Sequence, residues 1–535
     1  MLIYLRAFRT VKSHWLILAL AFYFAFVLNL EFWRFVFDRV DIDNGSMFLD
    51  SLLCLSMIFF TWFFCLLVIP ILGKPVIIIL LLMSSATNYF TFQLGIVIDS
   101  EMLRNVFETD LRESSDFITL SSVCWITVTG VLPAVLLGLC EIQYQSWKKE
   151  LLVRLAFILG GVIVISGFSV VLTKEYTSFF RNHNNAKKML NTYNYIYSTV
   201  RYFQKKSLTK REFVWLDRDV IAGNPNGKNL MILVVGETAR AMNFSLNGYE
   251  HGTNSLLSSQ NIVNFRNVTS CGTATAISVP CMFSHKRRKE FDVNEAKYTQ
   301  NLLDILSIAD YDILWLDNNS GCKGVCERVV TEKVVKMGNE EYCEKDYCHD
   351  EVMLERLEER IRSHDKNEMI VLHTLGSHGP SYYKRYPRIF RKFTPTCDTA
   401  DIHRCSREEI VNTYDNTIFY TDYFLSSIIN IVKKFPDKEI SVIYASDHGE
   451  SLGENGIYLH GLPYSIAPQE QKQIPLLVWL SDATQKRVDY DCLKAKAANA
   501  SFSHDHIFHS ILGFLEIKTK LFDSSLDIFQ GCYAK

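Results

Sequence analysis

Several features that would assign this protein to a particular class are missing from its sequence. The 535 residues carry a formal net charge of only −2, and the sequence pI is about 6.7. Since no excess of positive charge is available to bind a polyanion, we expect no nucleic-acid partner. Internal repeats and low-complexity tracts are also absent, so the sequence gives no sign of a repeat architecture.

A cleavable signal peptide and a zinc-finger spacing are missing as well. The first apolar run ends in Glu31-Phe32-Trp33 without a small-residue cleavage site, so we expect it to stay in the protein as a membrane span. A zinc finger needs two C-x2-4-C pairs, or one such pair with a histidine pair at set spacing, and the irregular gaps here fit poorly. Local disulfides are the favoured alternative.

Long apolar runs dominate the chain before about residue 175. Each is near the ~20 residues that a helix needs to cross a bilayer. A buried core helix would explain one such run, but five in succession favour a transmembrane domain of five helices. The five predicted spans are about 14–33, 47–70, 75–95, 118–140 and 153–173.

The basic residues around these spans predict their orientation. Positive charge collects before the first span and in the second and fourth connections, which are therefore predicted to lie inside. The connection between spans three and four is mainly acidic and is predicted to lie outside. An odd number of spans then places everything after about residue 175 outside. The inside residues are Arg6, Arg9, Lys12, Lys74, Lys148, Lys149 and Arg154.

The positions of the cysteines agree with that orientation. Of the 14 cysteines, four lie in or at the spans and ten lie in the part predicted to be outside. Close pairs in sequence predict local disulfides, which form in an oxidising compartment. We expect pairs between Cys271 and Cys281, Cys322 and Cys326, Cys343 and Cys348, and Cys397 and Cys405, with Cys492 and Cys532 as a further pair.

After Asn229 the sequence pattern changes to apolar runs that alternate with helical patterns, which is typical of a mostly parallel α/β sheet. Strands are predicted at 230–235, 311–316, 370–372 and 440–446, with 473–480 as an edge strand because Pro475 cannot donate to a central ladder.

Four of these strands run into an acidic residue or a histidine within two residues of their ends. Ligands of such sheets gather outside the carboxyl ends of the strands, so Glu237, Asp447 and His448 form a candidate metal site. Two carboxylates and an imidazole suit zinc or manganese. The alternative is polar residues that cap helices after the strands.

The stretch from Thr269 to Cys281 offers hydroxyl groups on a turn of small residues with a cysteine at each end. A hydroxyl becomes a nucleophile at neutral pH only beside a base or a metal. We therefore interpret this stretch as a nucleophile loop and include Thr275 in the metal site.

Further residues are candidates for handling a substrate. His378 and His460 stand beside glycine or proline turns and would orient a phosphate, act as acid and base, or bind a second metal, although a lone histidine is usually structural. Lys323, between two cysteines, is a candidate phosphate ligand or a solvated lysine. His373 is interpreted as a supporting or core residue.

The loop from Ile98 to Glu113 could be helical, which would place Asn105, Thr109 and Glu113 on one face. A solvated charged helix is the alternative. Residues about 175–210 combine aromatic and basic side chains, which indicates a linker along the membrane surface, with a plain bridging helix as the alternative.

Taken together, these motifs resemble the lipid A phosphoethanolamine transferases, the group that includes the mobile colistin-resistance enzymes. The resemblance covers almost the whole chain. It is carried by Gly236-Glu237-Thr238-Ala239-Arg240, the loop from Cys271 to Cys281, residues Asp317 to Gly324, Ser377-His378-Gly379-Pro380 and the run from Ser446 to Gly456.

The resemblance implies a transmembrane domain (1–174), an interfacial linker (175–228) and a periplasmic alkaline-phosphatase-like α/β domain (229–535) in the bacterial inner membrane. It implies transfer of phosphoethanolamine from phosphatidylethanolamine to a phosphate of lipid A, which lowers negative surface charge and gives polymyxin resistance.

It also implies roles for individual residues. Thr275 would carry a covalent phosphoethanolamine, and His378 and His460 would assist catalysis. One tightly bound zinc would be held by Glu237, Thr275, Asp447 and His448, and a second zinc is left open. The phosphoethanolamine group would be bound by Asn105, Thr109, Glu113, Asn319, Lys323, His378 and His460.

Three other functions remain as alternatives. A related transferase would modify a core sugar or a membrane-derived glucan, or would move phosphoglycerol. A sulfatase would need a cysteine or serine for conversion to formylglycine, which Thr275 cannot undergo. An envelope scaffold with a structural metal would not need a nucleophile loop.

Overall fold

The structure is a computed structural model of the 535-residue chain and describes residues 10–40, 42–109, 114–183, 186–207, 212–225, 227–334, 341–344, 347–363 and 365–534. The chain forms two compact units. One consists of Met1–Leu103 and Ile118–Arg201, and the other of Arg104–Phe117 and Tyr202–Lys535. The connection between predicted spans three and four therefore belongs, from Arg104 onward, to the second unit.

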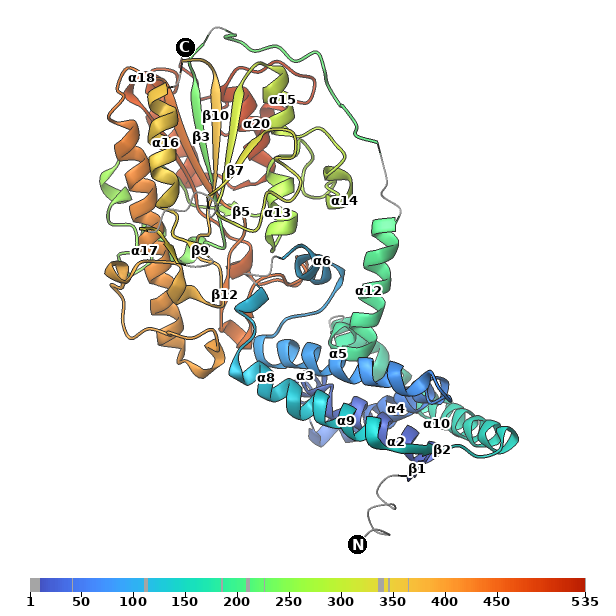
Figure 1. Ribbon diagram of the computed structural model, residues 1–535. Coiled ribbons are helices and arrows are strands. Elements are labelled where there is room, and N and C mark those ends of the chain that lie inside the picture. Colours follow the sequence, from blue (N-terminus) through green and yellow to red (C-terminus); the bar gives the residue numbers. More distant parts are fainter. Residues whose placement is uncertain are drawn as a thin grey trace. The chain divides into compact units, whose positions relative to one another are not determined.

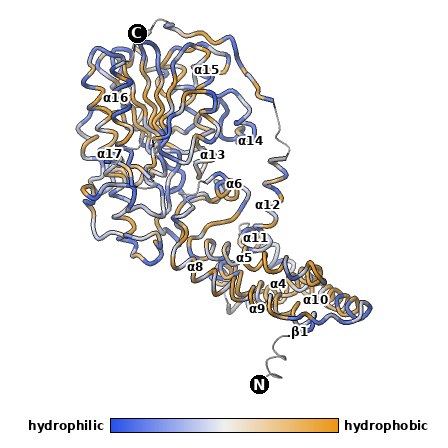
Figure 2. The backbone as a smooth tube through the Cα atoms, viewed as in Figure 1, coloured by the Kyte–Doolittle hydropathy of each residue, from blue (hydrophilic) through white to orange (hydrophobic). Residues whose placement is uncertain are grey.

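The first unit is helical. Its principal helices carry almost continuous apolar sequence, which Figure 2 shows as hydrophobic colouring along α4, α9 and α10. Its elements are β1 (Thr10–Lys12), α2 (Ser13–Phe22), a π-helical turn (Tyr23–Val27), α3 (Leu30–Phe37), α4 (Ile42–Leu67), α5 (Gly73–Leu94), α8 (Leu120–Ile126), a second π-helical turn (Thr127–Val131), α9 (Leu132–Leu139), β2 (Glu141–Gln143), α10 (Trp147–Asn182), α11 (Ala186–Met189) and α12 (Asn191–Ser207), which runs on into the second unit.

Four helices in the described residues are long and apolar enough to cross a membrane, and a bent pair makes up to five. The four are Gly45–Leu67, Gly73–Leu94, Leu120–Leu139 and Trp147–Asn182. The pair, Ser13–Val27 and Leu30–Phe37, is bent by 56°. At the break, Asn29 leaves the helical conformation and its Nδ2 donates to the carbonyl of Phe24 at 2.6 Å. The predicted α-helical membrane domain is confirmed with four or five candidate spans, and the segment predicted as its first span is the bent pair.

The second unit is built on a seven-stranded sheet in the order β4-β14-β11-β3-β10-β6-β7 (Figure 1). The five strands from β11 to β7 are parallel, and β14 and β4 are antiparallel to their neighbours. This confirms the prediction of a mostly parallel sheet. The strands are β3 (Leu230–Gly236), β4 (Val263–Phe265), β6 (Asp312–Asp317), β7 (Val330–Lys333), β10 (Glu368–His373), β11 (Ile440–Ser446) and β14 (Leu476–Leu480).

One predicted strand position is wrong. The segment 473–480 was expected at the sheet edge because of Pro475, but β14 lies between β11 and β4. The strand begins at Leu476, one residue after the proline, so the missing N–H falls outside the ladder. A proline at the entrance of a strand therefore does not require an edge position.

Helices cover both faces of the sheet. Apolar side chains of α13, α15, α19 and α20 form one core cluster with alternate residues of β3, such as Leu233. Figure 1 shows α16 and α17 beside the other face. The bounds are α6 (Ser100–Glu108), α13 (Thr275–Met282), α14 (Val293–Ala296), α15 (Leu302–Ile308), α16 (Val352–Ser363), α17 (Arg407–Val432), α18 (Asp482–Gln485), α19 (Tyr490–Asn499) and α20 (Asp505–Phe514).

The remaining strands are short and lie outside the main sheet. They are β5 (Val268–Thr269), β8 (Cys343–Glu344), β9 (Tyr347–Cys348), β12 (Ser451–Leu452), β13 (Tyr458–Leu459) and β15 (Phe502–Ser503). Five disulfides form within the second unit, all of them predicted pairs: Cys271–Cys281, Cys322–Cys326, Cys343–Cys348, Cys397–Cys405 and Cys492–Cys532.

Candidate metal centre and its nucleophile

The strand register brings the first two site residues together. Gly236 at the end of β3 pairs with Ser446 at the end of the parallel neighbour β11, so Glu237 and Asp447 leave the sheet at the same level. His448 follows Asp447, and ligand atoms of these three residues lie within 4.8 Å of one another. All three are buried.

Thr275 joins this cluster from a different element. It is the first residue of α13, where the unpaired N–H groups of the first helical turn favour negative charge. Its Oγ1 lies 3.3 and 3.2 Å from the two carboxylate oxygens of Glu237 and 3.4 Å from Nε2 of His448. The hydroxyl predicted as a nucleophile therefore faces the predicted metal ligands.

The composition of this cluster fits a divalent cation. It offers two carboxylates, an imidazole and a hydroxyl, which is an oxygen and nitrogen set suited to zinc. Asp447 Oδ2 is buried, and no donor in the described part of the chain forms a hydrogen bond with it. A buried carboxylate oxygen without a partner is costly unless a cation balances it.

Neighbouring groups fix the orientation of the predicted metal ligands Glu237, Asp447 and His448. Asn319 donates from Nδ2 to Oε2 of Glu237 at 2.7 Å, and the Thr238 hydroxyl donates to Oε1 at 2.5 Å. The backbone N–H of Thr238 donates to Oδ1 of Asp447 at 3.0 Å. His448 Nδ1 lies 2.9 Å from the carbonyl of Gly449, which makes Nδ1 the donor and turns Nε2 toward the cluster.

Electrostatics also indicate a need for positive charge. Burial raises the pKa of Asp447, and the adjacent Glu237 raises it further. Burial works in the same direction on Glu237, but His448 and His378 outweigh it, so the pKa of Glu237 is lowered. Two carboxylates this close cannot both ionise cheaply without a cation between them.

The two histidines predicted to handle the phosphoryl group lie beside the cluster. The ring of His460 is 4.3 Å from that of His448 and 5.2 Å from that of His378, measured between centroids. His460 Nδ1 lies 2.8 Å from Oε2 of Glu450, and the hydroxyl of Tyr382 donates to the other oxygen of that carboxylate at 2.5 Å.

Lys323 is held on a short constrained loop. It lies between the bonded cysteines 322 and 326 with a left-handed φ of 53°. Its ammonium group donates to the hydroxyl of Ser320 at 2.9 Å and to the carbonyl of Glu108 at 3.2 Å. Since Ser320 adjoins Asn319, which bonds Glu237, the loop continues directly from the ligand cluster.

The remaining predicted residues are less directly connected. Asn105 and Thr109 are half-buried at the end of α6, where the Thr109 hydroxyl donates to the carbonyl of Asn105 at 2.5 Å. Glu113 lies outside the described residues. His373 is buried beneath the site, with Nδ1 2.9 Å from Oδ1 of Asp317.

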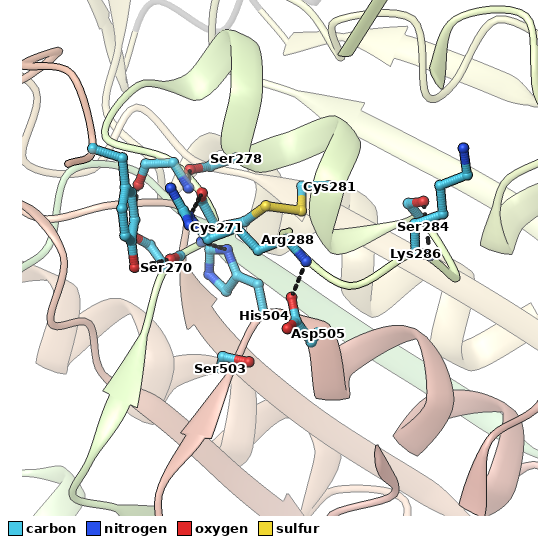
Figure 3. Close-up of a disulfide and its surroundings, with 12 residues drawn as sticks. Ser270, Cys271, Ser278, Cys281, Ser284, Lys286, Arg288, Ser503, His504 and Asp505 are labelled. Carbon is cyan, nitrogen blue, oxygen red and sulfur yellow. Dashed lines mark hydrogen bonds between the residues drawn. A yellow bond between two sulfur atoms is a disulfide. The ribbon is translucent and has the colours of Figure 1, made fainter. Parts of the chain in front are cut away.

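The loop before Thr275 is anchored by two side chains from other segments, one of them far away in the sequence (Figure 3). The backbone N–H of Cys271 donates to Nδ1 of His504 at 3.1 Å, and its carbonyl accepts from Nε of Arg288 at 2.9 Å. The disulfide to Cys281 joins this point to the end of α13. Thr275 is thus presented by a loop that is fixed on both sides.

Sequence reasoning assigned no role to several of these supporting residues. Glu450 and Thr238 lie within two residues of predicted metal ligands, so proximity was an available signal. Tyr382 and His504 gave no local signal, because only the folded chain brings them to the site.

Comparisons with known proteins agree with this architecture. Residues 56–207 match the family model for phosphoethanolamine transferase EptA/EptB, and residues 229–517 match the sulfatase family model. The chain is 41% identical over 537 residues to phosphoethanolamine transferase EptA of Escherichia coli K12, covering 97% of this chain and 96% of the relative.

Two further relatives extend the comparison. Phosphatidylethanolamine transferase Mcr-1 of Escherichia coli is 37% identical over 471 residues, which cover 85% of this chain and 84% of the relative. The solved structure of the integral membrane lipooligosaccharide phosphoethanolamine transferase A of Neisseria meningitidis matches with a TM-score of 0.95 at 38% identity, over 98% of this chain and 100% of that one. The chain belongs to the phosphoethanolamine transferase family, and its second unit is a member of the alkaline phosphatase and sulfatase superfamily.

Proposed function

We propose that the protein transfers phosphoethanolamine from phosphatidylethanolamine to a phosphate group of lipid A, with Thr275 as the covalent carrier. The observation that carries this proposal is the position of the Thr275 hydroxyl, 3.2 to 3.4 Å from Glu237 and His448 in a cluster that fits a divalent cation. Relatives of this chain are named for moving phosphoethanolamine, and two of them for acting on Kdo(2)-lipid A.

Glu237, Asp447, His448 and Thr275 would hold one tightly bound zinc, and His378 and His460 are the residues available to a second. A bound zinc would favour loss of the Thr275 proton and offset negative charge on the phosphoryl oxygens. Asn319 and Thr238 keep Glu237 in place for this task through their hydrogen bonds.

In the first half of the reaction, Thr275 Oγ1 attacks the phosphorus of phosphatidylethanolamine. A bond forms between Oγ1 and phosphorus, and the bond from phosphorus to the diacylglycerol oxygen breaks. His378 or His460 supplies the proton that the departing alkoxide needs. Lys323 places positive charge where the phosphoryl oxygens gain charge.

In the second half, an oxygen of a lipid A phosphate attacks the phosphorus of phospho-Thr275, and the threonine oxygen leaves. Two displacements through one covalent intermediate predict ping-pong kinetics. Asn319 and Lys323, with Asn105 in α6 and Thr109 and Glu113 after it in the sequence, would bind the phosphoethanolamine group in both halves.

The predicted orientation of the spans assigns this chemistry to the periplasmic side of the bacterial inner membrane. Both lipids would then reach the site from the membrane surface. Each transfer would add an amine to an anionic phosphate, which weakens attraction of cationic polymyxins to the cell surface and gives resistance to them.

The decisive experiment is the mass of the peptide that contains Thr275, from full-length protein incubated with phosphatidylethanolamine in detergent. We expect a gain of one phosphoethanolamine on wild-type protein and none on Thr275→Ala. Thr275→Ser keeps a hydroxyl at the same place and should retain part of the adduct. An unmodified peptide in zinc-loaded wild-type protein would overturn the proposal.

A second candidate function differs in the acceptor. The same geometry would serve a transferase that modifies a core sugar or a membrane-derived glucan. Adding purified lipid A or a glucan to the labelled enzyme and identifying which product gains the label separates these acceptors. An envelope scaffold with a structural metal predicts that Thr275→Ala leaves function intact.

A further inference from the structure

The segment 104–117 stands between two membrane spans in the sequence but packs as part of the second unit. It is anchored there at two places. The first anchor is Glu108, whose carbonyl accepts from Lys323 at 3.2 Å and whose carboxylate pairs with Lys297 at 2.8 Å. The second anchor is Asp116, which binds Lys384 and Arg385.

Asp116 binds two neighbouring cations with its two carboxylate oxygens. Oδ1 lies 2.7 Å from the ammonium group of Lys384, and Oδ2 lies 2.9 Å from Nη2 of Arg385. The side chains of Asp116 and Arg385 are 9% and 5% exposed, so this pair is desolvated, whereas that of Lys384 is 32% exposed. Burial alone would raise the pKa of Asp116, but Arg385 and Lys384 outweigh it and the pKa is lowered.

Arg385 connects this carboxylate to a residue of the proposed reaction. Its Nε donates to the backbone carbonyl of His378 at 2.7 Å, while Nη2 binds Asp116. A guanidinium group is planar and rigid, so fixing Nη2 also fixes the direction of Nε. Loss of Asp116 would leave a buried cation without this counter-ion and free the guanidinium to turn away from His378.

We propose that Asp116 is a positioning residue for phosphoethanolamine transfer, holding Arg385 in the orientation in which it fixes the backbone of His378. The inference rests on the proposed function, in which His378 acts on the phosphoryl group. The connection between the two predicted spans then has a role in catalysis. Glu108 contacts Lys323, and Asp116 acts on His378 through Arg385. An error of about 1 Å in such a group costs roughly 100-fold in rate.

The test measures how fast the Thr275 adduct forms in full-length, zinc-loaded protein at several concentrations of phosphatidylethanolamine. We expect Asp116→Asn to lower the rate at saturating donor by about 10- to 100-fold, with the half-saturating donor concentration changed by less than about twofold. Asp116→Glu keeps the charge and should recover most of the rate. Asp398→Asn breaks an ion pair to Arg391 of similar length, 2.8 Å, on the surface and should react like wild type.

A second variant, Arg385→Lys, distinguishes a loss of positioning from a general loss of stability. Arg385→Lys keeps a positive charge for Asp116 but removes the planar group that reaches His378. The double variant combines Asp116→Asn with Arg385→Lys. If Asp116 and Arg385 act through one contact, it should react no more slowly than the slower of the two single variants. The inference is overturned if Asp116→Asn reacts at the wild-type rate, if Asp116→Glu is as slow as Asp116→Asn, or if the double variant shows the product of the two losses. Wild-type protein that forms no adduct would instead overturn the proposed function.

Discussion

His460 Nδ1 lies 2.8 Å from Oε2 of Glu450, a buried carboxylate that also accepts a hydrogen bond from Tyr382. This contact fixes the orientation of the His460 ring relative to that of His448, and the two ring centroids are 4.3 Å apart. A histidine held by a carboxylate keeps one tautomer and one orientation, which an acid or base needs. Glu450 is thus the orienting partner of a proposed catalytic group, a role that the sequence analysis did not assign to it.

We predict that Glu450→Ala lowers the turnover number by about 100-fold, because both Tyr382 and His460 lose their partner. Glu450→Gln keeps an oxygen acceptor and should lose less, about tenfold. Steady-state kinetics with phosphatidylethanolamine and lipid A, with zinc content measured on the same samples, give the answer. Equal losses in the two variants would contradict an orienting role and point to a packing defect.

Metal removal should destabilise the wild-type protein and leave the variant Asp447→Asn unchanged. Chelation leaves Glu237 and Asp447 as adjacent buried carboxylates, so wild-type protein should lose thermal stability. Binding at 100 times its Kd contributes about 2.7 kcal/mol, which sets the expected scale. Readdition of zinc should restore both stability and transfer.

In metal-free protein at pH 8, Asp447→Asn should be more stable than wild type. Burial and Glu237 raise the pKa of Asp447 to about 6 in the folded protein, so the cost of ionising it builds up as the pH rises from the unfolded value to the folded one and is complete at pH 8. The same variant should gain no stability from zinc. Thermal unfolding of both proteins with and without chelator tests this, and a less stable metal-free variant would contradict the repulsion between the two carboxylates.

A pH dependence follows from His504, which anchors the nucleophile loop through Cys271. Burial lowers the pKa of His504 to about 3, below the value of about 6.5 for an unfolded histidine. Between these values the unfolded chain binds more protons, so stability is complete above about pH 6.5 and falls as the pH decreases. The loss is about 1.4 kcal/mol per pH unit.

His504→Gln removes this titration. At pH 7 the variant should be less stable than wild type, because the imidazole accepts from Cys271 and donates to the carbonyl of Ser446. From pH 7 to pH 5 the difference should shrink by about 2 kcal/mol. Denaturant unfolding of both proteins at the two pH values measures it, and a constant difference would contradict a neutral buried His504.

Much of the site followed from local sequence, because strand ends and cysteine spacing are local signals. Apolar runs that end in Gly236-Glu237 and Ser446-Asp447 predict that both carboxylates lie at the same edge of a parallel sheet. Four of the five disulfides followed from close spacing and from the compartment that the spans imply, whereas Cys492 and Cys532 lie 40 residues apart.

Long-range pairing could not be predicted in the same way. Pro475 suggested an edge strand, but only the fold shows that β14 starts just after it and carries β4 on its outer side. The segment 104–117 has the charge of an external loop, and its anchors at Lys323 and Arg385 lie more than 200 residues away. Burial of Glu450 likewise depends on Tyr382 and His460 meeting it in space.

Removing either of two disulfides should affect stability and transfer activity to different extents. In the chain-entropy account, a disulfide stabilises by closing a loop in the unfolded chain, and the effect grows with loop length. Cys492 and Cys532 are 40 residues apart, whereas Cys322 and Cys326 are 4 apart. The longer loop predicts a contribution of about 4 kcal/mol and the shorter loop about 2 kcal/mol.

Replacing Cys492 and Cys532 by serine should therefore cost more stability than replacing Cys322 and Cys326, yet leave transfer at the wild-type rate below the unfolding temperature. The second replacement frees the loop that presents Lys323 in its left-handed conformation, so it should raise the half-saturating donor concentration severalfold. Thermal unfolding and adduct formation on Thr275, measured on both double variants at one zinc occupancy, compare the two effects. Equal donor saturation in the two variants would show that Lys323 does not depend on its disulfide for position.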